Sequence, residues 1–186
     1  MSKKETIEQA ALNVFVTRGL YDAPMAFIAK EAGVPVGSIY TYFESKEALI
    51  NTLYLQFKQA MGYFIFSPVP PDLSIYAELK IYWTRAMQYG LAHPEGFFFA
   101  EQFSNSPMVQ PVSRDMVRAN FEKVYRLIDL GIQNGTFKPI DPDLLHHLIY
   151  TNITSMIKYL SLAKMTLDPE LEDHLFQCCW DGICVR

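Results

Sequence analysis

The stretch Phe27–Lys46 constrains the fold of this chain more than any other part of the sequence. Ile28, Ala29 and Ala32 place apolar side chains on one face of a short helix. Gly33 follows at the point where this helix ends, and glycine adopts the left-handed conformation of a helix end without strain. The spacing therefore predicts a short helix closed by a tight glycine turn.

A second short helix follows the turn. Pro35 suits a first helical turn, where a missing N–H costs nothing, and Ile39 and Phe43 lie four residues apart as anchors to a core. The residues left facing outward are Ser38, Tyr40, Thr41 and Tyr42. Two helices joined by a glycine turn, the second with a polar outer face, form a helix-turn-helix, whose second helix is used to enter the DNA major groove.

The rest of the chain is predicted to be helical throughout. We predict helices over residues 3–18, 24–32, 36–43, about 46–64, 73–92, 93–103, 112–134, 142–164 and 169–184. The surest helix starts are Asp141-Pro142 and Asp168-Pro169, each an N-cap aspartate followed by proline at the first helical position. Because no stretch alternates with period two, we expect an all-α protein of about nine helices. Residues 1–47 would form a three-helix helix-turn-helix domain and residues 48–186 a helical ligand-binding and dimerisation domain.

The composition of the chain excludes several classes of protein. The 186 residues are 50% hydrophobic and carry a net charge of −4, which argues against disorder and against a protein that coats nucleic acid along its whole surface. The first residues are not followed by an apolar signal-peptide core, and apolar runs break well before the roughly 18 residues of a membrane span. We therefore expect a cytoplasmic protein without a membrane segment.

Chemistry-bearing motifs are scarce. Cys178, Cys179 and Cys184 cluster near the C-terminus without a histidine at zinc-finger spacing, so we interpret them as reduced thiols. Adjacent His146 and His147 lie on different helix faces, which disfavours a shared metal. There is no nucleophile elbow, acid–base pair or phosphate loop. We expect no cofactor, no metal and no enzyme activity.

The first fifty residues resemble the DNA-binding domain of the tetracycline-repressor (TetR) family of bacterial regulators. The matching positions are Phe15, Arg18-Gly19, Ile28–Val34, Gly37–Phe43 and Ser45–Leu49. Core, turn, recognition and cap positions agree in order and spacing. The resemblance implies a homodimer that binds a palindromic double-stranded DNA operator, with a ligand pocket and dimer interface in the C-terminal helices.

The resemblance implies a set of DNA-binding residues. Tyr40 matches a phosphate-contact position of the family and Tyr42 one that often faces the groove. Lys46 opens a helix whose free N–H groups suit a phosphate. The full set is Pro24, Met25, Ala26, Pro35, Val36, Gly37, Ser38, Tyr40, Thr41, Tyr42 and Lys46. Pro35 and Val36 stand where many relatives carry polar residues, so hydrogen-bond donors to base edges are few.

The later helices are rich in aromatic and methionine residues, which favours a small apolar or aromatic effector if part of them lines a cavity, and a plain core otherwise. The candidate ligand-binding residues are Met61, Trp83, Met87, Phe103, Asn120, Phe121, Tyr125, Tyr150 and Asn152. One stripe of the last helix holds Leu171, Leu175, Cys178 and Gly182. With the helix over 142–164 this stripe suggests a four-helix dimer interface, or alternatively packing within the chain.

Two functions remain open from the sequence. The first is a homodimeric transcriptional repressor whose operator binding is released by a small, largely apolar ligand. The second is a dimeric small-molecule-binding module with weak or lost DNA binding. It is motivated by residues 1–50, where five lysines and arginines face six acidic residues, a net charge of −1.

Overall fold

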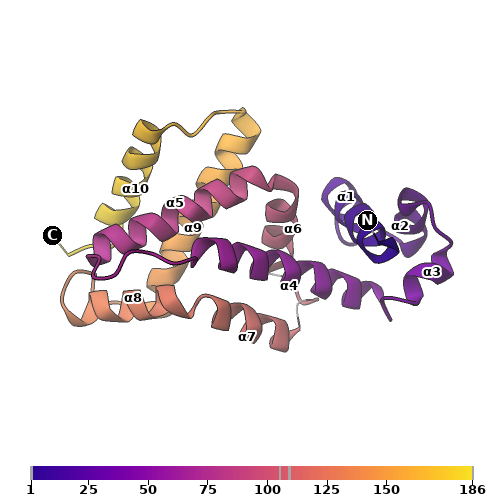
Figure 1. Ribbon diagram of the computed structural model, residues 1–186, viewed down its shortest axis with the longest axis horizontal. Helices are drawn as coiled ribbons and strands as arrows, with labels where there is room; N and C mark the ends of the chain where they lie inside the picture. Colours follow the sequence, from indigo (N-terminus) through magenta and orange to yellow (C-terminus); the bar gives the residue numbers. More distant parts are fainter. Residues whose placement is uncertain (1, 105, 109, 186) are drawn as a thin grey trace. The chain divides into compact units, whose positions relative to one another are not determined.

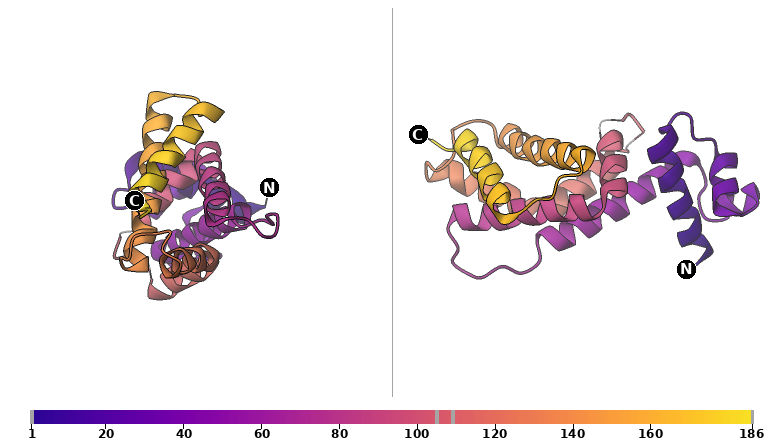
Figure 2. Two further views of the ribbon diagram at one scale, coloured as in Figure 1. Left: turned by 90° about the vertical axis from the view of Figure 1, so that its left-hand side faces the viewer. Right: turned by 90° about the horizontal axis from the view of Figure 1, so that it is seen from above.

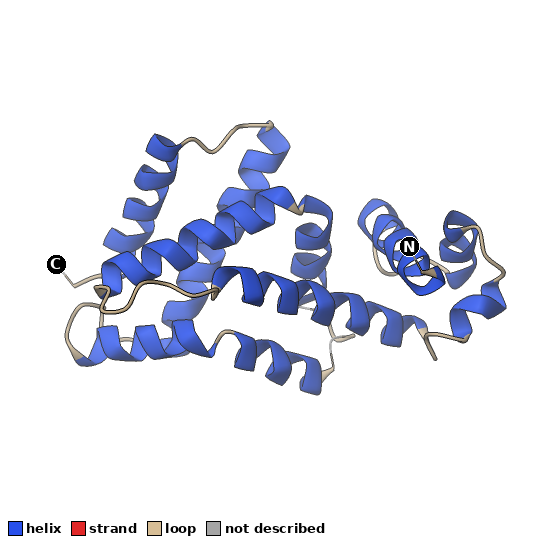
Figure 3. Cartoon of the chain, viewed as in Figure 1, coloured by secondary structure: helices blue, strands red, loops and turns tan. Residues whose placement is uncertain are grey.

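A computed structural model describes residues 2–104, 106–108 and 110–185. All regular structure in these residues is helical apart from one isolated bridge between Phe137 and Cys184 (Figure 3). The helices, labelled in Figure 1, are α1 Lys3–Arg18, α2 Met25–Ala32, α3 Val36–Tyr40, α4 Lys46–Ile65, α5 Ile75–Ala92, α6 Pro94–Ser104, α7 Pro111–Asn120, α8 Glu122–Gln133, α9 Pro142–Ala163 and α10 Pro169–Ile183. The predicted all-α class is confirmed, with ten helices in the described residues where about nine were expected.

The additional helix arises because the stretch predicted as one helix over 112–134 is two. Phe121 separates α7 from α8 with φ −104° and ψ 13°, and its N–H bonds the carbonyl of Arg118 three residues back at 3.0 Å. Its ring packs edge-on against Phe66 with 5.3 Å between centroids. Apolar periodicity continues through Phe121, so the sequence pattern does not reveal the break.

Three predicted helix starts have the expected side-chain caps. Ser45 Oγ accepts a hydrogen bond from the N–H of Ala48 at 3.1 Å, so α4 begins at Lys46 as expected. Asp141 caps α9 through two N–H groups, at 2.9 and 3.2 Å. Asp168 caps α10 through the N–H of Leu171 at 2.8 Å. These caps fix the ends of the helices that carry the candidate sites.

The chain divides into two compact units. Unit 1 contains the residues up to Lys58 together with Pro94–Val117, and unit 2 contains Gln59–His93 and the residues from Arg118 onward. The predicted boundary after residue 47 differs from this division, because the first part of α4 and the whole of α6 pack with α1–α3. Both α4 and α7 continue from unit 1 into unit 2.

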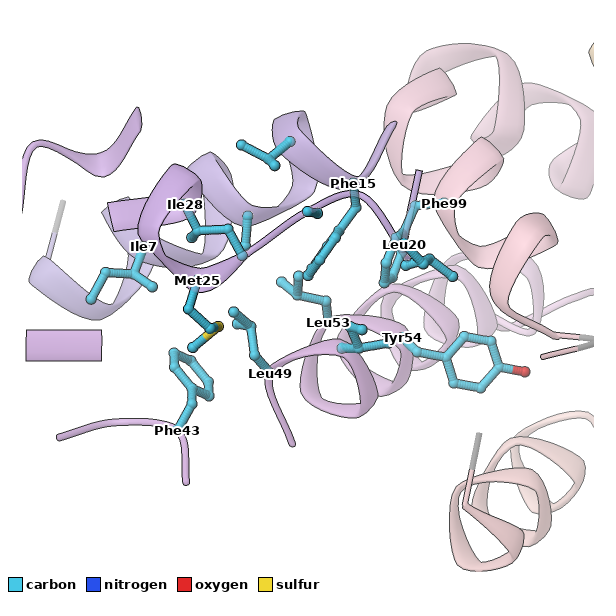
Figure 4. Close-up of a cluster of buried hydrophobic side chains, with 14 of the residues drawn as sticks. Ile7, Phe15, Leu20, Met25, Ile28, Phe43, Leu49, Leu53, Tyr54 and Phe99 are labelled. Carbon is cyan, nitrogen blue, oxygen red and sulfur yellow. The ribbon is translucent and has the colours of Figure 1, made fainter. Parts of the chain in front are cut away.

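The core of unit 1 is a single apolar cluster (Figure 4). Phe15 from α1 stacks on Phe99 from α6 with 5.8 Å between ring centroids. Ile28 of α2 and Leu49 of α4 are fully buried beside them. The cluster gives the short helices α2 and α3 a firm base, since helices of eight and five residues have little stability alone.

In unit 2, α5 packs against α8, α9 and α10, and α10 lies beside α5 and α9 (Figure 2). The indole N–H of Trp83 donates to Asn152 Oδ1 at 3.1 Å and so links α5 to α9. Lys80 pairs with Asp173 at 2.7 Å and links α5 to α10. In the described part of the chain, no helix is both long and apolar enough to span a membrane.

Candidate nucleic-acid interface

The turn between α2 and α3 has the geometry that the sequence predicts. Gly33 adopts φ 65° and ψ 32°, in the left-handed region. The N–H of Val34 donates to the carbonyl of Ala29 at 3.0 Å, and that of Gly33 to the carbonyl of Lys30 at 3.2 Å. This double closure ends α2 sharply and redirects the chain into α3.

Two buried anchors hold α3. Ile39 and Phe43 are 0% and 4% exposed, as expected for residues that face the core. The helix ends at Tyr40, three residues before the predicted end, and a turn follows in which the N–H groups of Tyr42 and Phe43 donate to the carbonyl of Ile39 at 2.9 and 3.0 Å. The anchors therefore hold both the helix and the turn after it, so the outer side chains are presented on a fixed backbone.

The outer face of α3 and its following turn is open. Tyr40 and Tyr42 are 51% and 43% exposed. Ser38 Oγ accepts a hydrogen bond from Lys3 Nζ at 3.4 Å, and Thr41 Oγ1 donates to the carbonyl of Gly37 at 3.3 Å. The remaining predicted residues of this face, Pro35, Val36 and Gly37, are also exposed. Phenol and hydroxyl groups are thus the hydrogen-bonding groups that this face can offer to phosphate or base edges.

Lys46 opens α4 beside this face. Its ammonium lies 3.5 Å from the carbonyl oxygen of Tyr21 and 6.0 Å from the centroid of the Phe15 ring. Partial burial lowers the pKa of Lys46, while Glu47 and Asp22 oppose that change. The cation and the first N–H groups of α4 form a combination that suits a phosphate.

The start of α2 matches the prediction only in part. Pro24 and Ala26 are exposed, but the side chain of Met25 is buried in the core of unit 1 beside Phe43 (Figure 4). Met25 was expected to face DNA because of its position at the helix start, whereas its side chain turns inward to fill space under α3. Phe27 is not among the predicted DNA-binding residues, but it is exposed and carries the Arg18 guanidinium 4.3 Å above its ring. The pairing of a cation with an aromatic ring nine residues later has no local sequence signal.

The predicted ligand-binding residues separate into two groups. Phe103 belongs to unit 1, where it stacks on Phe99 and meets Tyr54 edge-on, because α6 packs with α1 and α4. Its assignment to a pocket of the second domain is thus not supported by its position. The others lie in unit 2: Met61, Trp83, Met87, Asn120, Phe121, Tyr125, Tyr150 and Asn152.

Within unit 2 these residues form local contacts. Met61, Trp83 and Met87 are buried. Tyr125 stacks on His146 with 4.5 Å between centroids, and His146 stacks on Tyr150 at 6.2 Å. The two clefts described, of about 370 Å³ in unit 1 and about 460 Å³ along α5, are lined by other residues. The ligand set therefore stays a prediction.

Asn120 is the unit 2 residue with an unsatisfied group. Its side-chain Nδ2 is buried and has no hydrogen-bond partner among the described residues. Unpaired buried donors are rare and costly in folded proteins. A hydrogen-bond acceptor on a bound molecule would satisfy this one.

The predicted dimer stripe on α10 is partly exposed. Cys178 and Gly182 are exposed, and Leu171 and Leu175 are half-buried. The predicted partner of this stripe is the helix over 142–164, for which no individual residues are predicted. The large apolar side chains exposed on that helix, α9, are Leu144, Leu148, Tyr159 and Leu162. Together with the α10 stripe they leave an apolar surface on unit 2.

The three cysteines are free thiols that differ in exposure, with Cys178 exposed and Cys179 buried. Burial raises the pKa of Cys179 to about 12 and also raises that of Cys184. Among the residues that the structure describes, no three histidine, cysteine or acidic side chains lie together as metal ligands would.

Comparisons with known proteins cover both units. A family model described as bacterial regulatory proteins of the tetR family matches residues 7–58, and one described as a tetracyclin repressor-like C-terminal domain matches residues 55–185. The chain is 27% identical over 146 residues to the uncharacterized HTH-type transcriptional regulator YhgD of Bacillus subtilis, covering 77% of this chain and 76% of that protein. It is 24% identical over 179 residues to the HTH-type transcriptional regulator RutR of Escherichia coli K12, covering 94% of this chain and 83% of RutR.

The structural comparison extends over the whole chain. The crystal structure of a tetR family transcription regulator from Shewanella sp. PV-4 matches with a TM-score of 0.88 and 26% identity, covering 100% of both chains. The first family model covers the helix-turn-helix, the second covers the helices of unit 2, and this structural match includes both. The chain belongs to the TetR family of bacterial transcription regulators, a family of DNA-binding proteins that are not enzymes.

Proposed function

We propose that this chain is a homodimeric repressor that binds a palindromic operator and is released by a small, largely apolar effector. The observation that carries the proposal is the outer face of α3, where Tyr40 and Tyr42 project from a backbone anchored by Ile39 and Phe43. Lys46 stands at the adjacent helix start with N–H groups available to a phosphate. Phosphate contacts would fix the register, and the tyrosine hydroxyls would reach phosphate or base edges.

Dimerisation is supported by the exposed apolar face of α9. Leu144 and Leu148 lie one turn apart, and Tyr159 and Leu162 continue the same face near the other end of the helix. Exposed apolar side chains gathered on one helix face mark a protein interface more often than a solvated helix. A two-fold pair would present two recognition helices to half-sites about 34 Å apart.

The effector would bind in unit 2. Buried methionine and aromatic side chains of α4 and α5 suit an apolar molecule, and the unpaired Asn120 Nδ2 suits a hydrogen-bond acceptor on it. Release requires that the effector bind more tightly to a conformation that fits the operator poorly. An apolar body with one carbonyl, carboxylate or ether oxygen would meet both requirements.

One observation favours the second candidate, a dimeric ligand-binding module with weak DNA contact. The recognition helix Val36–Tyr40 holds no lysine or arginine, and residues 1–50 carry a net charge of −1. Electrostatic attraction to phosphate would then rest on few cations.

Selection from a random duplex library at low salt separates the two candidates. The repressor proposal predicts enrichment of a palindromic sequence whose affinity falls steeply as salt rises. If no duplex is enriched above the starting library, the proposal of operator binding fails and the second candidate stands.

A further inference from the structure

Asn51 of α4 makes an unusual set of hydrogen bonds in the interior of unit 1. Its side chain is 6% exposed. The Nδ2 group donates to the carbonyl of Glu47 at 2.8 Å and to the carbonyl of Met108 at 3.0 Å. Oδ1 accepts from the N–H of Gln110 at 3.2 Å and from the hydroxyl of Ser113 at 3.0 Å. One amide thus connects α4 to a segment about sixty residues further along the chain.

These four bonds use both donors and both acceptor lone pairs of the amide. Backbone carbonyls can only accept and the N–H of Gln110 can only donate, so the orientation of the amide is fixed. A saturated buried polar group holds its partners in one arrangement more strictly than apolar packing does, because any shift leaves a buried group unpaired. Asn51 therefore specifies where Met108, Gln110 and Ser113 lie against α4.

The segment held by Asn51 is the start of α7. The carbonyl of Gln110 accepts the N–H of Ser113 at 3.0 Å, which closes the first turn of α7. Both α4 and α7 continue from unit 1 into unit 2. Within unit 2, the last residue of α7, Asn120, lies against Gly62 of α4, its Cβ 3.5 Å from where a Cβ on that glycine would stand. Asn51 thus joins the unit 1 ends of two helices that both lead to the predicted effector site.

We propose that Asn51 is a positioning residue for DNA binding, which ties the start of α7 to the end of α4 that carries Lys46. The inference rests on the proposed function. Lys46 lies five residues before Asn51 on the same helix, about 7.5 Å along its axis.

The test compares Asn51→Leu with the wild type on the selected duplex at several salt concentrations. Leucine has a similar volume and removes all four bonds. We expect the dissociation constant of the folded, active fraction to rise about tenfold or more. The salt dependence should stay the same, because no phosphate contact is removed. Lys46→Ala should instead reduce the salt slope by about one unit.

Two further variants keep the test decisive if Asn51→Leu folds poorly. Ser113→Ala removes one of the four bonds and should weaken DNA binding by a smaller factor with the same slope. Thr52→Val is the matched control: within the described residues, the Thr52 hydroxyl donates to the carbonyl of Ala48 in the same helix, at 2.8 Å. It should bind DNA as the wild type does.

A role of Asn51 in stability alone would lower the active fraction and leave the dissociation constant unchanged in both Asn51→Leu and Ser113→Ala, and that result would overturn the inference. The inference is also overturned if Thr52→Val weakens DNA binding as much as Asn51→Leu does. Failure of the wild type to bind any duplex would overturn the proposed function itself. The two failures are therefore distinguishable.

Discussion

The interiors of the two units differ in polarity. Among the described residues, the polar or charged side chains that are buried are Asn51, Lys58, Ser106, Ser113 and Thr154. All but Thr154 belong to unit 1, around α4 and the segment that leads from α6 into α7. Unit 1 therefore fixes part of its interior through directional hydrogen bonds, whereas buried side chains in unit 2 are mainly apolar.

The exposed faces of α3 in unit 1 and of α9 in unit 2 also differ in polarity. The face of unit 1 around α3 ends in hydroxyl groups, but α9 of unit 2 exposes Leu144, Leu148 and Leu162. A polar interior costs stability and specifies position, and an exposed apolar face costs solubility and favours association. The proposed function assigns the DNA contacts to unit 1 and the contact between two protomers to unit 2. The following predictions test this division of roles.

The largest effect should come from the apolar face of unit 2. Leu148→Glu places a charge in the proposed interface, so we expect a shift to monomers and operator binding at least about 100-fold weaker, since a monomer engages one half-site. Sedimentation velocity and DNA titration measure the two effects. Leu130→Glu on α8 is the matched control, because Leu130 and Leu148 are 51% and 52% exposed. Equal behaviour of the two variants would place the interface elsewhere.

A smaller effect is expected at the start of α4 in unit 1. Lys46→Ala removes the cation beside the first N–H groups of α4, so affinity should fall about tenfold for all duplex sequences alike, with the salt slope reduced by about one. Fluorescence anisotropy across a salt series measures both quantities. Lys164→Ala in unit 2 should leave them unchanged. A sequence-selective loss at Lys46 would contradict a phosphate contact.

The buried Lys58 gives the interior of unit 1 a dependence on pH. Burial lowers the pKa of Lys58 from 10.5 to about 8, opposed by Glu101. Between these values the folded chain has lost the proton and the unfolded chain still holds it, so this group makes stability rise with pH. Relative to Lys58→Met, the wild type should gain about 1 kcal/mol between pH 7.5 and 9, from roughly 1.4 kcal/mol per pH unit.

Urea unfolding of both proteins at the two pH values measures this gain. Other groups whose protonation differs between the folded and unfolded chains in this range, such as the Cys179 thiol with its raised pKa in the folded state, are common to both proteins and cancel in the difference. A stability difference that stays constant with pH would show that the Lys58 ammonium is solvated.

The smallest effect is expected from the hydroxyl groups of the α3 face. Tyr40→Phe keeps the ring and removes one phenol donor, so operator affinity should fall about three- to fivefold, the range for one hydrogen bond at a solvated interface. Tyr63→Phe is a control, because Tyr63 is 82% exposed and lies in unit 2. If Tyr40→Phe binds the operator as tightly as the wild type, the Tyr40 hydroxyl makes no contact with DNA.

The helix-turn-helix was predictable because its signals are local. Gly33, the anchors Ile39 and Phe43, and the cap Ser45 each follow from a residue type at a fixed spacing. The caps Asp141 and Asp168 made the later helix starts predictable in the same way. Local chemistry therefore made the turn between α2 and α3 and the capped helix starts predictable from the sequence alone.

The features that the sequence did not reveal depend on tertiary packing. Apolar periodicity continues through Phe121, yet α7 ends just before this residue and α8 begins just after it. The Phe121 ring packs on Phe66, which is distant in the sequence. Phe103 is of a type that often lines a ligand pocket, and Met25 lies at a helix start. Both side chains are buried in the core of unit 1 instead. The bonds of Asn51 join residues 57 to 62 positions apart, and no local pattern indicates such a partner.

The central claim, that two copies of this chain read one palindromic duplex, is tested most directly by native mass spectrometry of the protein on its selected duplex. The account predicts two protomers per palindrome and binding to a single half-site at least about 100-fold weaker. One protomer per duplex, with equal affinity for the half-site and the full palindrome, would contradict it.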